Sequence, residues 1–289
     1  MEKKMKIGFI DLSIDEWHAN NYPAWFRSSP RAAEIELGYA WEKTPNPAGK
    51  ALGDWCREYG MTPAASLEEV VERSDALCVL APSNPEVHEE LAKLPLKSGK
   101  PVYVDKPFAP SKAAAKRMFA LAEKHGTPLM SSSALRFGEE LMEAKKRLRE
   151  EAGKIVSAVT TGGGKTFEEY GIHQLEMLVS CLGTGAKRVM SCSRTEPNLH
   201  LMIDYGGERF GMAHYHPALP FSAALGTNAF LVSEQTRVEK RMFENLIAEM
   251  TEFFFSGTSP IPQEETIEIA ALLEAGVSAS GKPFEWIQI

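Results

Sequence analysis

Residues 76–80 read Ala-Leu-Cys-Val-Leu, an apolar run that contains no charged side chain. A short continuous run of this kind is typical of a strand that is buried on both faces of a parallel sheet. The capping-box sequence Ser66–Glu69 starts a short helix before it, Leu67–Arg73, and a helix over Pro85–Lys93 follows it. The run therefore predicts a strand of a βαβ unit.

The same alternation continues in both directions along the chain. Before the run we expect the strands Lys6–Ile10 and Glu34–Trp41. A helix over Ala48–Tyr59 follows them and is capped by Gly60. Expected after the run are a strand, a helix and a strand: Pro101–Val104, Ser111–His125 and Pro128–Ser131. Strict alternation predicts an α/β fold, a doubly wound parallel (Rossmann) sheet with Lys6–Ile10 at its centre. Ligands bind beyond the carboxyl ends of such strands.

After about residue 130 the pattern changes to longer helices and several strands separated by turns. The expected helices are Glu139–Glu151, Glu169–Leu182, Lys240–Phe255 and Gln263–Ala275. The expected strands are Ile155–Thr161, Lys187–Ser193, Leu199–Tyr205, Arg209–His216 and Ala229–Ser233. This order predicts a C-terminal α+β domain on a mostly antiparallel sheet. We therefore expect a dinucleotide-binding domain over 1–128 and a substrate and oligomerisation domain over 129–289.

Composition and charge exclude several classes of protein. Of the 289 residues 44% are hydrophobic and 25% charged, and 32 basic against 39 acidic side chains give a formal charge of −7. This balance predicts a globular protein without affinity for nucleic acid or acidic membranes. No apolar run approaches the ~20 residues of a membrane helix, and the N-terminus has no signal-peptide pattern, so a cytoplasmic location is expected. The four cysteines lack metal-ligand spacing, which predicts reduced thiols and no metal.

Four motifs in order along the chain resemble the glucose–fructose oxidoreductase/inositol dehydrogenase (Gfo/Idh/MocA) family. They are Ala81-Pro82-Ser83-Asn84 with His88, Val104-Asp105-Lys106-Pro107-Phe108, Glu169-Tyr170-Gly171-Ile172-His173-Gln174-Leu175-Glu176, and the tail from Gly257-Thr258-Ser259-Pro260 to Ser278. The second is similar to the family's strand-end EKP motif with Asp for Glu, and the third to its D-x-G-x-H-x-x-D helix start. The resemblance covers nearly the whole chain.

The resemblance implies an NAD(P)-dependent dehydrogenase that transfers a hydride between the cofactor and a hydroxyl of a sugar, polyol or related small molecule. It also implies a homodimer or homotetramer. Glu42 follows the second strand, where dinucleotide folds place an acid on the ribose hydroxyls, and this favours NAD over NADP. The residues expected to bind cofactor are Asp11, Ser13, Glu42, Pro82, Asn84, His88, Asp105 and Lys106.

Three residues are candidates for catalysis. Lys106 follows a strand end, where the family places its catalytic lysine, and would steady a developing alkoxide. His173 and Glu169 are four residues apart on one helix face, so the carboxylate is expected behind the imidazole of a general base. Glu176 falls where the family often has another Asp and is expected, with Lys106, to contact substrate.

The glycine fingerprint G-x-G-x-x-G of dinucleotide folds is missing from the turn after the first strand. Here the turn reads Ile10-Asp11-Leu12-Ser13-Ile14-Asp15-Glu16-Trp17-His18-Ala19, with three acids where two phosphates dock. Like charge there opposes phosphate, so replacing Asp11 and Asp15 with glycine is expected to tighten NAD binding. Two alternatives stay open: a non-redox family member that binds a ligand or regulates, and a lyase or epimerase that holds NAD tightly.

Overall fold

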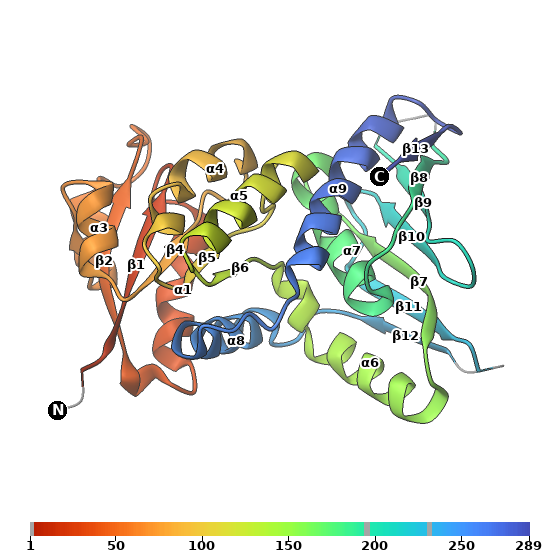
Figure 1. Cartoon of the computed structure of the whole chain (residues 1–289), viewed down its shortest axis with the longest axis horizontal. Coiled ribbons are helices and arrows are strands. Elements are labelled where there is room, and N and C mark those ends of the chain that lie inside the picture. Colours follow the sequence, from red (N-terminus) through yellow and green to blue (C-terminus); the bar gives the residue numbers. More distant parts are fainter. Residues whose placement is uncertain (1–2, 194–196, 230–232) are drawn as a thin grey trace. The chain divides into compact units, whose positions relative to one another are not determined.

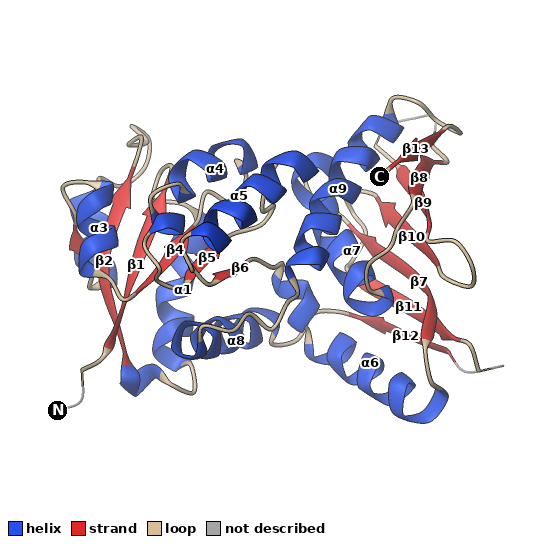
Figure 2. Cartoon of the chain, in the orientation of Figure 1, coloured by secondary structure: helices blue, strands red, loops and turns tan. Residues whose placement is uncertain are grey.

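The structure is a computed structural model that describes residues 3–193, 197–229 and 233–289. The chain divides into two compact units, each with its own sheet (Figures 1 and 2). The first unit contains Met1–Ser132 and Leu246–Gln263, and the second contains Ser133–Asn245 and Glu264–Ile289. Leu246–Gln263 thus group with the first unit although they lie between the two segments of the second in sequence. The division of labour between a cofactor domain and a substrate domain stays a prediction.

The first unit is built on a six-stranded parallel sheet in the order β3-β2-β1-β4-β5-β6. Its strands are β1 Met5–Asp11, β2 Ile35–Glu42, β3 Thr62–Pro63, β4 Ala76–Val79, β5 Val102–Val104 and β6 Leu129–Met130. The first strand lies between β2 and β4, as predicted. The predicted fold class, a parallel Rossmann-type sheet followed by a mostly antiparallel one, is confirmed.

Helices connect these parallel strands. They are α1 Trp17–Ser28, α2 Leu52–Tyr59, α3 Leu67–Arg73, α4 Pro85–Ala92 and α5 Lys112–Lys124, with short 3₁₀ turns η1 Ala32–Glu34 and η2 Pro95–Lys97. Ser66 Oγ accepts a hydrogen bond from the Glu69 N–H and so caps α3, as the capping-box pattern predicted. The helix α8, Met242–Ser256, extends into this unit, where the rings of Phe254 and Phe26 stack 6.4 Å apart.

The apolar run that predicted the fold is buried along its whole length. All four residues of β4 have no exposed surface, because β1 and β5 flank the strand and other elements cover both faces. At roughly 25 cal/mol per Å² of apolar surface removed from water, this burial drives the formation of the sheet. It also fixes the ends of β1, β4 and β5 at one edge, which is where parallel strands bring their C-terminal residues together.

The second unit is built on a seven-stranded sheet in the order β12-β11-β7-β10-β9-β8-β13. Only β7 and β10 run parallel, and the other neighbours pair antiparallel. The strands are β7 Ile155–Gly162, β8 Arg188–Ser191, β9 Leu199–Asp204, β10 Phe210–Tyr215, β11 Ser222–Thr227, β12 Ser233–Arg237 and β13 Trp286–Gln288. The helical elements are η3 Ala134–Phe137, α6 Glu139–Ala152, α7 Phe167–Leu182 and α9 Gln263–Ser280.

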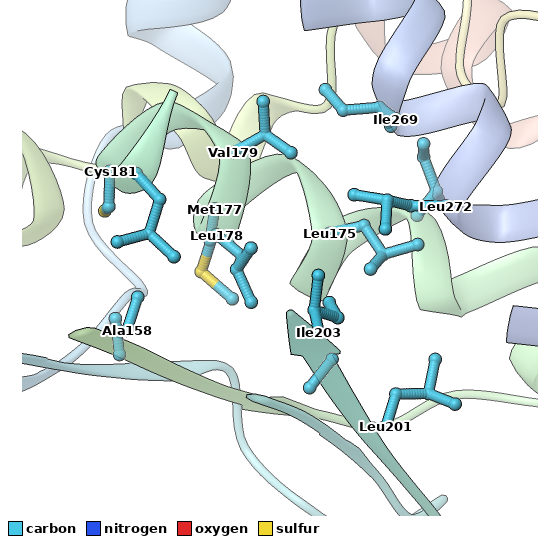
Figure 3. Close-up of a cluster of buried hydrophobic side chains, with 14 of the residues drawn as sticks. Ala158, Leu175, Met177, Leu178, Val179, Cys181, Leu201, Ile203, Ile269 and Leu272 are labelled. Atoms are coloured by element: carbon cyan, nitrogen blue, oxygen red, sulfur yellow. The ribbon is translucent and has the colours of Figure 1, made fainter. Parts of the chain in front are cut away.

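The core of the second unit lies between its helices and one face of its sheet. Figure 3 shows side chains of α7 and α9, among them Leu175 and Leu272, opposite Leu201 and Ile203 of β9. Alternate residues of β9 and β10 are buried, which is the period-two pattern of a sheet covered on one face. This packing fixes α7, and with it His173, relative to the sheet.

The sequence analysis missed parts of this sheet. Strands β11, β12 and β13 were not predicted, and the strand expected over Ala229–Ser233 falls partly on residues 230–232, outside the described residues. The strand β11 reads Ser-Ala-Ala-Leu-Gly-Thr and β12 reads Ser-Glu-Gln-Thr-Arg. Small and polar residues leave no strong alternation of hydrophobicity, and β12 is an edge strand whose side chains are polar throughout.

A glycine in the central strand allows α3 to approach the sheet closely. A Cβ at Gly8 would lie 2.3 Å from Ser74 Oγ and 2.7 Å from Val70 Cγ1, closer than van der Waals contact. We expect Gly8→Ala to lower the free energy of unfolding by about 2 kcal/mol through overpacking. Urea denaturation measures this value. The control is Gly38→Ala in β2, where the nearest atoms would be 3.5 Å away; an equal loss in both variants would contradict the steric argument.

Candidate cofactor and substrate site

The carboxyl ends of the first unit's central strands carry buried acids rather than open polar groups. Asp105, directly after β5, is fully buried, and its Oδ2 forms a short contact with Nδ1 of His18 in α1. Its Oδ1 accepts hydrogen bonds from the hydroxyls of Tyr103, at 3.0 Å, and Tyr22, at 3.3 Å. Burial by itself raises the pKa of Asp105, but the His18 imidazole outweighs burial and leaves that pKa below its usual value. Asp105 therefore holds α1 against the strand end.

Asp11, the last residue of β1, also points into the protein and is 1% exposed. Its Oδ1 accepts hydrogen bonds from the backbone N–H groups of Ser13, at 3.3 Å, and Ala81, at 3.2 Å. No described residue bonds to its Oδ2. Burial, and next the charge of Glu16, raises the pKa of Asp11 well above 3.8. The carboxyl of Asp11 thus links β1 to the turn after β4.

His88 holds the same turn from the other side. Its ring is fully buried, with Nε2 lying 2.5 Å from the Leu80 carbonyl oxygen and Nδ1 lying 3.1 Å from the Phe108 carbonyl oxygen. Burial lowers the pKa of His88, and the carbonyl groups that face its ring oppose this shift. Between these clamps Ala81 has φ 59°, a left-handed conformation that costs a non-glycine residue roughly 1 kcal/mol or more. His88 and Asp11 together stabilise this turn.

The other residues predicted on this edge are more accessible. Lys106 is half-buried and follows Asp105, with a cis peptide bond to Pro107. Pro82 is half-buried, and Asn84 donates a hydrogen bond from Nδ2 to the Glu86 carboxylate at 3.0 Å. Of the residues expected to bind cofactor, Lys106, Pro82 and Asn84 therefore have exposed surface, whereas Asp105 and His88 bond to other parts of the chain.

The loop between β1 and α1 is closed by bonds to the segment after β2. Glu42 is 8% exposed, and its Oε2 accepts a hydrogen bond from the Ile14 N–H at 3.0 Å. Ser13 Oγ donates to the Thr44 carbonyl at 2.5 Å, and the Thr44 N–H donates to the Leu12 carbonyl at 2.8 Å. The side chains of Glu42 and Ser13, both expected to bind cofactor, are therefore committed to holding this loop.

Glu16 is the N-cap residue of α1. One oxygen of its carboxylate accepts a hydrogen bond from the His18 N–H at 2.8 Å and the other from the Ala19 N–H at 2.5 Å. These first-turn N–H groups are the donors with which the first helix of a Rossmann fold binds the pyrophosphate of a dinucleotide. The donor set therefore fits an anion, and the anion that it holds is the chain's own carboxylate.

In the second unit, His173 is the seventh residue of α7 and is half-buried. Its Nδ1 is 2.7 Å from Ser133 Oγ, and its ring packs edge-on against Phe221 with centroids 5.3 Å apart. Ser133 Oγ in turn accepts a hydrogen bond from the Leu135 N–H at 3.3 Å, as N-cap of η3. The imidazole is thus oriented by a hydroxyl that the backbone holds in place.

Two of the predictions about α7 need correction. The partner of Nδ1 in His173 is the Ser133 hydroxyl and not the expected Glu169 carboxylate. Glu176, expected to bind substrate, is 3% exposed and forms an ion pair with Arg136, whose Nη1 also lies 2.7 Å from Glu265 Oε2. The Arg136 guanidinium thus ties η3 to α7 and to α9.

Sequence reasoning missed Ser133, Arg136 and the capping role of Glu16. Ser133 ends a run of three serines after β6, and hydroxyls at a strand end were the available signal. Arg136 carries no such signal, because its two partners are 40 and 129 residues further along the chain. Glu16 was counted among the acids of the turn, but glutamate is not a favoured N-cap residue.

Residues 3–193, 197–229 and 233–289 contain no group of three or more His, Cys, Asp or Glu side chains arranged to hold a metal ion. Within the same ranges no helix has both the length and the apolar surface needed to pass through a bilayer.

The fold and the strand-end edge define a Rossmann-type protein, and comparison with known families supports the same class. Residues 16–133 match the model of GFO_IDH_MocA, described as an oxidoreductase family with an NAD-binding Rossmann fold. This match confirms the predicted recognition of the Gfo/Idh/MocA family over the N-terminal part of the chain. The uncharacterized oxidoreductase YhhX of Escherichia coli (strain K12) is 31% identical over 134 residues, which are 41% of this chain and 39% of that protein. The chain thus matches about two fifths of this relative's length.

Solved structures share the fold over the whole chain. GenD2 from gentamicin A biosynthesis, crystallised in complex with NAD, superposes with a TM-score of 0.80 at 14% identity and covers 100% of this chain and 97% of its own. A putative myo-inositol dehydrogenase from Sinorhizobium meliloti 1021 superposes with a TM-score of 0.79 at 13% identity, covering 99% and 100%. At these identities the likeness establishes the fold of both units.

The Asp105–His18 pair offers a test of what stabilises the strand-end edge. We expect Asp105→Asn to lower the free energy of unfolding at pH 7 by about 3 kcal/mol, because it leaves a buried imidazole without its carboxylate. The pKa of Asp105 lies below 3.8 in the folded chain, so its contribution is present above that pH and is lost as the pH falls further. The difference between variant and wild type should therefore shrink on acidification.

Urea denaturation at a series of pH values measures this difference. The matched control is Asp54→Asn, which removes the acid of the exposed Arg57–Asp54 pair and should change stability by less than about 1 kcal/mol. A loss at Asp105 that is as small as the loss at Asp54 would show that the buried pair does not hold α1 in place.

Proposed function

We propose that the protein is a nicotinamide-dependent oxidoreductase that acts on a hydroxyl of a sugar, polyol or related small molecule, with NAD favoured over NADP. The observation that carries this proposal is the imidazole of His173 in α7, which the hydroxyl of Ser133 orients. The family match over residues 16–133 supports a nicotinamide cofactor. Oxidation removes a proton and a hydride from the alcohol and leaves a carbonyl group; the cofactor, when bound, accepts the hydride.

The groups of this chain would handle the proton and the charge. If Nδ1–H of His173 donates to Ser133 Oγ, Nε2 is unprotonated and can take the hydroxyl proton, which is the tautomer that a general base needs. The Lys106 ammonium would steady the alkoxide as the proton leaves. Ser133 therefore takes the orienting role that the sequence analysis gave to Glu169, and it is a positioning residue.

A second candidate function is a family member without redox activity. The closed loop between β1 and α1 favours it, because Glu16 holds the N–H groups that a pyrophosphate would use. Calorimetric titration of the chain with NADH and NADPH separates the two functions. Binding of either cofactor keeps the oxidoreductase, and a panel of sugars and polyols with NAD or NADP, followed by the absorbance of reduced nicotinamide, then identifies the substrate class. Absence of binding to both favours the second function.

We also propose self-association into a homodimer or homotetramer. The face of the second sheet opposite its core carries an apolar cross-strand row in register, formed by Met190, Met202, Met212 and Val159. A contiguous half-exposed apolar surface is typical of an association site. Light scattering on the purified chain measures the number of copies.

With an active substrate in hand, we expect His173→Ala to lower kcat by about 10²–10⁴-fold, because it removes the base. Lys106→Ala should lower kcat at least as much, and Ser133→Ala should lower it more than Glu169→Gln, because Ser133 holds the ring. NADH affinity, measured by calorimetry, should stay close to wild type in the His173 and Ser133 variants. The control is His125→Ala, at an exposed position at the end of α5. Full activity of His173→Ala would end the catalytic assignment.

A further inference from the structure

The cap of α1 differs chemically from the other side-chain caps described in the chain. Ser66, Ser111 and Thr166 each cap a helix with a neutral hydroxyl that accepts one N–H. Glu16 instead places a carboxylate there, and its two oxygens accept two N–H groups. A charge-assisted pair of bonds at the positive end of a twelve-residue helix is stronger than a single neutral one. The start of α1 thus already binds an anion.

The rest of the loop keeps Glu16 in this position. Asp15 Oδ2 accepts a hydrogen bond from the Lys50 N–H at 2.8 Å, and its Oδ1 accepts one from Asn20 Nδ2 at 2.9 Å. Glu42 holds the Ile14 N–H on the other side. Because the polar groups on both sides of Glu16 are bonded within the chain, the loop does not depend on a ligand for its conformation.

The neighbouring acids do not occupy the position of a phosphate. Asp11 is turned into the protein, where it bonds to the Ala81 N–H, and Asp15 bonds to the segment after β2. Replacing Asp11 would remove a link between strands, and Asp15 lies beside the first turn of α1. The prediction that glycine at these two positions tightens NAD binding stays a prediction. Glu16 alone among the three bonds to the first-turn N–H groups of α1.

The position of α1 makes these N–H groups relevant to the cofactor. The sheet order β3-β2-β1-β4-β5-β6 reverses between β1 and β4, and ligands of doubly wound sheets bind at such a switch point. Asp11 is the last residue of β1 and so lies at this switch point; it is 1% exposed, and its Oδ2 has no hydrogen-bond partner among the described residues. A pyrophosphate that docks there needs the N–H groups of His18 and Ala19.

We propose that Glu16 is an intramolecular competitor for the pyrophosphate of the nicotinamide cofactor. A dinucleotide binds in the usual pose only when the Glu16 carboxylate leaves the start of α1, so this side chain sets the affinity for the cofactor. The inference rests on the proposed function for the identity of the ligand. It rests on the cap geometry for the mechanism.

The test measures binding of NADH, ADP-ribose and inorganic pyrophosphate by calorimetry to the full chain and to variants at position 16. Glu16→Ser keeps an N-cap hydroxyl of the kind that Ser66 and Ser111 supply, and it removes the carboxylate. Glu16→Gln keeps the size of the side chain and removes only its charge. Melting curves followed by circular dichroism verify that both variants fold.

We expect Glu16→Ser to bind all three ligands at least about tenfold more tightly than wild type, because the competing charge-assisted bonds are gone. Glu16→Gln should gain less, since its amide oxygen still accepts one N–H. Two controls separate competition at the start of α1 from a change in net charge and from the loss of a helix cap. Asp54→Asn removes the charge of an exposed acid in the first turn of α2, and Ser111→Ala removes a cap from α5. Both should bind like wild type.

The outcomes distinguish this inference from the proposed function. If wild type binds NADH and Glu16→Ser binds it no more tightly, the competition is refuted and the oxidoreductase stands. If Glu16→Ser gains affinity for pyrophosphate and ADP-ribose but no variant binds NADH, the competition stands and the proposed function fails. An equal gain in Asp54→Asn would reduce the effect to the net charge of the chain and overturn the inference. If neither the wild type nor any variant binds any of the three ligands, both the competition and the proposed function are overturned.

Discussion

The buried carboxylate of Asp105 is the interaction on which the cofactor edge of the first unit depends. It pairs with His18 and accepts hydrogen bonds from two tyrosines, one on β5 and one on α1. A charge without exposed surface is tolerated only when its partners repay the loss of hydration, and here three groups share that task. Because His18 is in the first turn of α1, the same carboxylate fixes where the helix begins. The position of Glu16 and of the neighbouring N–H groups follows from it.

A second consequence concerns how the polar groups at this edge are used. In an open crevice, backbone donors and acidic side chains at strand ends are left for a ligand. Here Asp11 binds the turn after β4, His88 clamps that turn from α4, and Glu42 binds the loop before α1. Each bond satisfies a group whose burial without a partner costs about 1–3 kcal/mol. The edge is therefore stable in the absence of a ligand. Lys106, which is half-buried, places a positive charge at this edge.

Particular residues show how far the sequence predicts this arrangement. The run Ala76–Val79 predicted its strand correctly, because burial on both faces demands a continuous apolar segment. The motifs around Lys106 and His173 placed Lys106 just after a strand and His173 within a helix, and the structure has both residues in these elements. The direction of the Asp11 side chain was not predictable, because Asp11 is the last residue of β1 and the regular alternation of side chains between the two faces of the sheet ends there. The pairing of His173 with Ser133 joins residues 40 apart in sequence, and no local pattern encodes it.

Glu16 illustrates why the missing glycines do not by themselves decide whether a cofactor binds. Glycines in the fingerprint provide close approach for a phosphate, but the attraction comes from the N–H groups of the helix, which every residue except proline supplies. In this chain the N–H groups of His18 and Ala19 are present and already bonded. The net affinity for a dinucleotide is therefore the difference between two anions at the same donors, one tethered and one free. A tethered carboxylate is always near its donors, so a free ligand must bind more strongly than the carboxylate, and contacts elsewhere on the ligand must supply the excess.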